Sequence, residues 1–514
     1  MAAPVGIRTR YSLGSHPLPG PLAAVCISVG ASTIGVMAGS SPASALALAA
    51  GAVLVVAVAV RPEIATLVVL AVLYSNAAVL AVTYHGMPAF ISAAVPMLLI
   101  APLVHLLLVQ REPFILVKPL PWVIGFGLVQ VAGTIASSSS ATAATTLGTF
   151  VLEGIGIYLL VTNVVRRLDV LRKAVWILLG VGAFLGFLSL VQTVTGDTGN
   201  EWWGFAQAST ATFGDDSAFG ETVRLGGPLE QNNRYAQIML VLVPLGIFRY
   251  MAERDPLRRG AAAVATLLIV AGVVLSYSRG AAVGLAVAFV AMAALRYVRL
   301  RTFVVVVVLV VAVVASVPQY RARLQTLTAV SDLASEDDGS RGVDTSIASR
   351  ATENVAAFLA FAENPLLGVG PGLFGTVYGD YAERVQGDVR NVKASPRESH
   401  NLYLGVAAEN GVPGLVCLGG VFAVTLRELA RARRRALERA PELAALAGGF
   451  IIAVIAYMAS AVFLHFAFIR YFWLFMALAA ATARIVLREV PPADEDHVGW
   501  RTNGLTAAAR VDGS

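Results

Sequence analysis

Apolar runs of about twenty residues recur along this chain, and each is long enough to cross a hydrocarbon core of about 30 Å as a helix. The runs are apolar throughout, whereas the strands of a transmembrane barrel alternate apolar and polar residues. The sequence is 57% hydrophobic and 14% charged, a balance typical of a polytopic membrane protein rather than of a soluble domain. It therefore predicts an all-α polytopic membrane protein with about 12–14 transmembrane helices.

Lys and Arg residues are concentrated on every second connection between these runs. Such cations mark the cytoplasmic side of a membrane protein, and here that side includes both termini. The apolar stretch after Arg8 and Arg10 is also compatible with a signal peptide, but the many helices that follow favour an uncleaved first span. The expected spans are about 21–39, 43–60, 64–82, 88–109, 119–137, 144–165, 173–194, 234–250, 260–276, 280–297, 302–318, 401–426, 445–466 and 471–487.

This topology predicts a multi-pass protein of the cytoplasmic (inner) membrane, with two long extracytoplasmic loops and a functional site on the outer face. The expected parts are a cytoplasmic N-terminus (1–20), N-terminal transmembrane helices (21–194), an outer loop (195–233), central helices (234–318), a long outer loop (319–399), C-terminal helices (400–487) and a cytoplasmic tail (488–514).

The second outer loop is expected to contain an amphipathic surface helix over 349–363 and a glycine-rich turn over 364–374. Glycines at this density suit a close backbone approach, either to a ligand or to another helix. The turn lacks the Lys and the Ser or Thr of a nucleotide-binding loop. The apolar face of the helix would hold Val355, Phe358 and Leu359, and the polar face Arg350 and Glu353.

The first outer loop carries two adjacent aromatic residues, Trp202 and Trp203. Their rings either stack on sugars or anchor the loop at the membrane interface, which is the commoner role of such residues.

Two arginines on short outer connections, Arg279 and Arg470, oppose the charge rule. A cation at such a place needs a partner or a role, unless its side chain only reaches toward the lipid headgroups. Glu153 and Glu409 lie inside expected helices, where each is either a buried partner for an arginine or part of a proton path. Glu409, about two turns beyond His400, either belongs to the site or pins its helix through hydrogen bonds.

His400 stands where the second outer loop ends and an apolar helix begins, in the Ser-His-Asn-Leu-Tyr-Leu segment at 399–404. A histidine side chain can take up or release a proton near neutral pH. This one either makes ordinary polar contacts at a helix start or transfers a proton at the membrane surface. The topology brings it to the same side as Arg224, Arg279 and Arg350, and this convergence favours proton transfer.

These residue types suit group transfer from a lipid-linked diphosphate. Guanidinium groups present forked donors to phosphate oxygens, and the natural anion beside a bilayer is a lipid diphosphate. His400 would take a proton from an attacking hydroxyl while the arginines neutralise the departing diphosphate. Because a diphosphate is already an activated leaving group, neither a nucleotide nor another cofactor is expected.

Metal ions and nucleic acid are not expected partners. A metal site would show clustered carboxylates with ligand-like spacing, and a thiolate site or disulfide would show paired cysteines. The net charge of +6 comes from basic residues scattered between apolar runs, which indicates membrane topology rather than nucleic-acid binding. The outer carboxylates without such spacing are Asp215, Asp216, Glu336, Asp337 and Asp338, and the two cysteines in separate apolar runs are Cys26 and Cys417.

Three segments resemble the bacterial O-antigen ligase and O-antigen polymerase-like membrane family. They are Ser-Tyr-Ser-Arg-Gly at 276–280, Arg350 followed by Asn-Pro-Leu-Leu-Gly-Val-Gly-Pro-Gly at 364–372, and the segment 399–404 with Glu409 and Gly411. The similarity covers roughly residues 224–414. Members of this family transfer a glycan from undecaprenyl diphosphate to an acceptor hydroxyl at the outer face, without metal or nucleotide.

The resemblance implies a glycan ligase or polymerase with His400 as its base or activating residue. It implies that Arg279 and Arg350, and also Arg224, bind the diphosphate, and we expect Glu409 and Asn401 to complete the substrate-binding set. The implied partners are an undecaprenyl-diphosphate-linked glycan as donor, a glycan, lipid or protein as acceptor, and the membrane.

Two other classes of function remain open. A transporter of a small anion or envelope precursor would show helices broken near the middle of the membrane and related halves. Here the glycine-rich breaks are expected in outer loops and no duplicated pattern is seen, which favours the enzyme. A scaffold in a cell-envelope complex is the third class.

Overall fold

The computed structural model describes residues 62–212, 221–298, 345–385, 396–464 and 469–492. The chain divides into two compact units, Met1–Ala65 and Thr66–Ser514, and the second unit holds nearly all of the described residues. The expected spans 21–39, 43–60 and 302–318 lie outside the described residues, as do the N-terminus, the tail from 493, Cys26 and the five outer carboxylates named above.

Within the described residues, eight helical segments are long and apolar enough to cross a membrane. A ninth is formed by α3 (Pro62–Tyr74) and α4 (Ala77–His85) if this pair, bent by 57°, is one span. The two shorter apolar helices α7 and α14 coincide with the expected spans 119–137 and 280–297. Every expected span that falls among the described residues therefore corresponds to a helix or helical pair, and the all-α polytopic fold class is confirmed.

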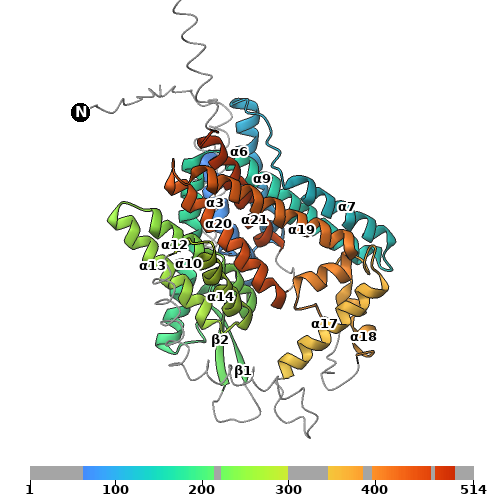
Figure 1. Cartoon of the computed structure of the whole chain (residues 1–514). Coiled ribbons are helices and arrows are strands. Elements are labelled where there is room, and N and C mark those ends of the chain that lie inside the picture. The colour runs from blue at the N-terminus through green and yellow to red at the C-terminus, as the bar shows by residue number, and fades with distance from the viewer. Residues whose placement is uncertain (1–61, 213–220, 299–344, 386–395, 465–468, 493–514) are drawn as a thin grey trace, which may run out of the picture. The chain divides into compact units, whose positions relative to one another are not determined.

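Figure 1 labels most of these elements along the chain. In order, they are α5 (Phe90–Met97) with α6 (Ile100–Val104) and η1 (His105–Val109), α7 (Leu120–Ala136), α8 (Ser140–Thr149) with η2 (Phe150–Gly156) and α9 (Ile157–Val164), α10 (Leu168–Thr195), α11 (Asn232–Leu240) with α12 (Leu242–Ala252), α13 (Pro256–Leu275), α14 (Arg279–Ala294), α19 (Leu402–Ala436), α20 (Pro441–Ser460) with η5 (Ala461–Phe463), and α21 (Ile469–Glu489).

The core lies where α7, η2, α9 and α21 meet. Its centre is Trp473, which is fully buried and makes edge contacts with Phe150, Tyr158 and Phe472. Such aromatic pairs stabilise by about 0.5–1.5 kcal/mol beyond their buried area. This cluster fixes the C-terminal helix against the earlier spans.

Helix α19 is longer than the sequence predicted, because it continues from the expected end near 426 to Ala436. The added residues are mostly Ala, Arg, Leu and Glu, which are strong helix formers even outside the membrane. Its one interruption is Gly411, whose φ of 62° and ψ of −164° are not helical.

The first outer loop contains structure that the sequence did not predict. A short helical turn, η3 (Trp202–Gly204), precedes two antiparallel strands, β1 (Gln207–Thr212) and β2 (Glu221–Gly227). In their register Thr210 lies opposite Val223, and these two β-branched residues are of the type that favours sheet. The hairpin is therefore a small addition to an otherwise helical fold.

The expected amphipathic helix is α17 (Thr345–Glu363), which is followed by α18 (Phe374–Ala382). Both pack against α19 and lie beside its N-terminal part in Figure 1. Of the predicted apolar face, Val355 is 39% and Phe358 54% exposed, as expected for side chains that face lipid. The opposite face, with Ala356 and Ala360, is fully buried against its neighbours.

Candidate active site

A buried carboxylate holds the histidine that the sequence singled out. Glu353 Oε2 lies 2.6 Å from His400 Nδ1, and the Glu353 side chain is only 1% exposed. The His400 side chain keeps 28% of its surface exposed. One ring nitrogen is thus held by the protein, while part of the ring remains accessible from outside. This is the arrangement of a base oriented by a carboxylate.

The carboxylate has further partners around it. Ser349 Oγ donates to Glu353 Oε1 over 3.2 Å, and Arg397 Nε lies 3.7 Å from the same oxygen. A carboxylate that leaves water needs such partners to remain charged. Glu353 is therefore a built part of the site and not a chance surface contact.

Sequence reasoning placed Glu353 correctly on the polar face of the helix but gave it no function. The same face carries Ser349, Thr352, Ala356 and Ala360, and small residues at this spacing allow another helix to come close. That pattern was the available signal, because a carboxylate on a close-packed face is buried and must have a partner.

The start of α19 positions the histidine. Asn401 is the N-cap, and its side-chain oxygen accepts hydrogen bonds from the backbone N–H groups of Tyr403 (2.9 Å) and Leu404 (3.2 Å). This is the preferred side chain for that position, and it fixes the chain direction next to His400. The capping role engages the Asn401 oxygen in holding the helix, while the binding role predicted for Asn401 stays a prediction.

Arg224 stabilises the turn that precedes Arg279. From strand β2 it donates to the carbonyl of Ser276 (3.2 Å), the carbonyl of Tyr277 (3.5 Å) and Asn233 Oδ1 (3.2 Å). Tyr277 has a φ of 51°, a left-handed conformation that costs a bulky residue about 1–3 kcal/mol unless its surroundings hold it. Arg224 supplies that support.

Arg279 is the first residue of α14, directly after the N-cap Ser278, whose hydroxyl accepts from the backbone N–H of Ala281. Arg279 thus stands at a helix start, a position that itself favours anions, and its Nε atom is buried. Arg350 lies on α17 less than one turn before Glu353, on the same side of that helix.

One ion pair joins the segment of Arg224 to that of His400. Arg234, at the start of α11 and next to the Asn233 that binds Arg224, pairs with Glu398 at 3.1 Å. Glu398 precedes His400 by two positions. The structure thus connects the hairpin, the α13–α14 turn and the start of α19, which are segments far apart in sequence. Sequence reasoning had not assigned Arg234 to the site.

The glycine-rich turn approaches helix α19, as in one of the two alternatives left open by the sequence. The N–H groups of Val369 and Gly370 donate to the carbonyls of Ala408 (2.8 Å) and Glu409 (3.2 Å). A Cβ on Gly368, which has a φ of 68°, would come within 2.3 Å of the Glu409 backbone. From the other side, the Pro365 carbonyl accepts from Val412 N–H at 2.8 Å, beside the break at Gly411.

Glu409 holds this turn from within α19. The backbone N–H groups of Gly372 and Phe374 donate hydrogen bonds to its carboxyl, and Phe374 is the first residue of α18. A carboxylate at a helix start is stabilised by the helix dipole. These contacts support the pinning role, which keeps α18 and the turn against α19 near His400.

Arg470, the weaker of the two exceptions to the charge rule, has a partner. Its Nε lies 3.8 Å from Glu153 Oε2, and both side chains are largely buried. This contact supports the first of the two alternatives left open for Glu153, that of a partner for an arginine.

The two tryptophans of the first outer loop line a hollow of about 510 Å³. Trp202 and Trp203 both have positive φ angles (46° and 58°), and Trp203 is 72% exposed. Bulky residues rarely adopt this conformation, and strain of this kind concentrates at binding sites. The other residues that line the hollow are Tyr84, Gly199, Asn200, Glu201 and Gly204.

In the part of the chain that the structure describes, no group of three or more His, Cys, Asp or Glu side chains is arranged to hold a metal ion.

These features define a polytopic α-helical membrane protein with a carboxylate-held histidine at the start of one span. Residues 264–419 match the family model described as O-antigen ligase, so the predicted resemblance is confirmed and the chain is O-antigen ligase-like. The match includes Arg279, Arg350 and His400, whereas Arg224, which we expected inside the similarity, lies before it. A comparison with curated proteins finds no match. The family implies glycan ligase or polymerase activity in general, in a multi-pass protein of the inner membrane that acts on a lipid-linked glycan.

Proposed function

We propose that this chain transfers a glycan from an undecaprenyl-diphosphate carrier to an acceptor hydroxyl at the outer face of the cytoplasmic membrane. The observation that carries the proposal is the 2.6 Å contact between buried Glu353 and His400, inside the segment that matches the ligase family. An oriented base is what a hydroxyl nucleophile requires.

In this reaction Glu353 accepts a hydrogen bond from the Nδ1–H of His400, and this tautomer makes Nε2 the ring nitrogen that accepts a proton. The acceptor hydroxyl gives that proton to Nε2 as its oxygen attacks the anomeric carbon of the glycan. The bond from that carbon to the diphosphate oxygen breaks, and undecaprenyl diphosphate leaves. The Glu353 charge stabilises the imidazolium that forms, as an acidic residue does for the histidine of a catalytic triad.

Arg279 and Arg350 would hold the departing diphosphate, since guanidinium forks match its oxygens and compensate its growing charge. Arg224 contributes by keeping the α13–α14 turn in place, because its donors already reach two carbonyls of that turn. The arginines thus supply the charge that a metal ion supplies in many other phosphate-handling enzymes.

The structure offers a specific observation on the transporter alternative. One of its broken spans, at Gly411, is filled by the backbone of Pro365 and Leu366, whose carbonyl oxygens come within 2.5 and 2.6 Å of where a Cβ would stand. Transporters use such breaks to coordinate their cargo. A break filled by the protein's own loop favours an enzyme.

The test uses the purified full-length protein with a lipid-linked glycan and candidate acceptors. Release of undecaprenyl diphosphate together with a joined glycan product is expected, and His400→Ala is expected to abolish both while the protein still inserts. Equal product from His400→Ala and the wild type would refute the proposal. Absence of product with glycan, lipid and protein acceptors alike would favour the scaffold. Labelling that places His400 and Arg279 on opposite sides of the membrane would also refute the proposed glycan transfer.

A further inference from the structure

A second charged site lies at the other end of α19, away from His400. The C-terminal turns of this helix and the residues after α21 enclose a hollow of about 760 Å³. Five of its lining side chains are arginines, and among the described residues no carboxylate lines it. The lining residues are Arg427, Ala430, Arg431, Arg434, Arg435, Arg439, Pro491 and Pro492, and we call this hollow the arginine groove.

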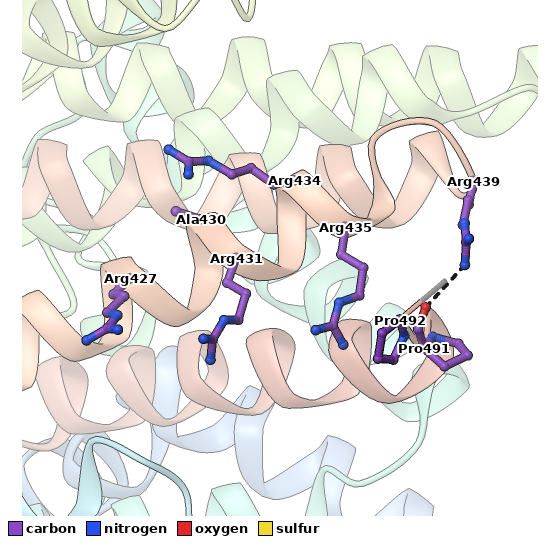
Figure 2. A pocket seen from close by; sticks show the side chains of 8 residues that line it. All are labelled: Arg427, Ala430, Arg431, Arg434, Arg435, Arg439, Pro491 and Pro492. Carbon is purple, nitrogen blue, oxygen red and sulfur yellow. Dashed lines mark hydrogen bonds between the residues drawn. The ribbon is translucent and has the colours of Figure 1, made fainter. Parts of the chain in front are cut away.

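Three of these arginines act together because of their helical spacing. Arg427, Arg431 and Arg435 are four residues apart, and Figure 2 shows them projecting to the same side of α19, whereas Arg434 points away. Successive members of the row are about 6 Å apart along the helix axis. Arg439 closes one end by donating to the Pro491 carbonyl at 3.2 Å.

The carboxylates of the described residues compensate this charge only in part. Arg431 pairs with Glu428 at 3.3 Å, but the same carboxylate also pairs with Lys118 at 2.8 Å. Like charges one turn apart on a helix repel, so a row of this kind is favourable only with an anion beside it. The positive-inside rule requires cations somewhere in the connection between α19 and α20. It does not require that these cations line one hollow.

We infer that the arginine groove binds the headgroup of an anionic phospholipid, and specifically one that carries two phosphodiesters. A row of forked donors repeating every helical turn fits two linked phosphates better than one. The row occupies the last turns of α19, where the topology expected from the sequence puts the lipid headgroups, and Leu437 next to it in the chain is 49% exposed and available to an acyl chain. Basic pockets between helices on the cytoplasmic side are typical sites for such lipids.

The test measures lipid binding to the detergent-solubilised full-length protein by native mass spectrometry and by thermal shift. Cardiolipin, which has two phosphodiesters, is expected to bind and raise the Tm, phosphatidylglycerol to bind at least about tenfold more weakly, and free pyrophosphate to leave the Tm unchanged. The variant Arg427→Gln/Arg431→Gln/Arg435→Gln is expected to lose cardiolipin affinity at least about tenfold. The matched control is Arg254→Gln/Arg258→Gln, which removes exposed arginines outside the groove and is expected to bind as the wild type does.

Several results would overturn the inference. Equal cardiolipin binding by the triple variant and the wild type would show that the arginine groove is not the binding site. An equal loss of cardiolipin affinity in the control variant would mean that binding depends on net charge and not on the arginine groove. A Tm rise with pyrophosphate alone would make the ligand a soluble phosphate, and equal binding of phosphatidylglycerol would overturn the two-phosphate specificity. If the triple variant does not insert, Arg427→Gln, whose side chain is exposed, makes the same comparison with an expected loss of about threefold.

Discussion

Glu353 and His400, which are 47 positions apart in the chain, meet through a contact of 2.6 Å between a carboxylate oxygen and a ring nitrogen. The glutamate comes from α17 and the histidine from the residue before the N-cap of α19. Because α17 is held against α19 through fully buried alanines, the geometry of this pair depends on helix packing and not on a loop. Rigid support of this kind is what an oriented base needs.

The first prediction concerns the charge of Glu353. Glu353→Gln keeps the shape but removes the negative charge that stabilises the imidazolium, so kcat should fall by on the order of a hundredfold or more. Ser349→Ala removes only the hydroxyl that donates to Oε1, and we expect a loss below about tenfold. Rates of glycan transfer with saturating donor measure both. A Glu353→Gln enzyme at wild-type rate would mean that the carboxylate is structural.

The second prediction separates two arginines. Arg279→Lys should lower kcat/KM by on the order of a hundredfold with little change in Tm, because a point charge does not replace a fork on the diphosphate. Arg224→Lys should lower both activity and Tm, because Arg224 supports the left-handed Tyr277. Arg258→Lys, at an exposed position in the first turn of α13, is the control. The assignment fails if Arg279→Lys transfers glycan normally.

The third prediction concerns the break in α19. Gly411→Ala would force a Cβ to within 2.5 Å of the Pro365 carbonyl at a φ of 62°, so we expect a loss of about 1–3 kcal/mol in stability and a lower Tm. Gly419→Ala, in the same helix, meets no atom within 4 Å and should leave the Tm unchanged or slightly higher. Similar Tm values for the two variants would contradict this account of the break.

The fourth prediction decides between the two roles of the tryptophans. If Trp203 stacks on a sugar, Trp203→Ala should raise KM for the glycan several-fold, since an aromatic stack is worth about 0.5–1.5 kcal/mol. If the ring only anchors the loop at the interface, KM should stay unchanged and the amount of inserted protein should fall. Transfer kinetics and membrane abundance, measured on the same preparation, distinguish these outcomes.

The fifth prediction concerns metal removal. Because the arginines would compensate the diphosphate charge, transfer by protein treated with EDTA and assayed in EDTA should proceed at the untreated rate. Restoration of a lost rate by added Mg²⁺ or Mn²⁺ would assign that charge to a metal instead.

The transmembrane spans were predictable because the length of an apolar run indicates directly whether it can cross a membrane as a helix. For α10 and α20 the sequence predicted both that a transmembrane helix is present and where it approximately begins and ends. The end of α19 was predicted about ten residues before its position in the structure. A prediction from apolar residues stops at the membrane surface, whereas Ala and Arg residues continue the helix beyond it. The hairpin was missed because a short polar loop with two strands has no apolar alternation to reveal it.

The sequence predicted the candidate site as a set of charged residues, but it did not predict which of their side chains make contact. His400 could be chosen from its position at a helix start. Its partner Glu353 could not, because the pairing depends on how α17 packs on α19. Likewise, the contact of Arg234 with Glu398 joins segments whose proximity only the folded chain reveals.

The contact between the glycine-rich turn and α19 is made largely by main-chain atoms, from Val369 and Gly370 to Ala408 and Glu409. Such a joint does not depend on which side chains surround it, provided that the glycines remain. Neighbouring loop residues are therefore free to vary without shifting the Glu353–His400 pair.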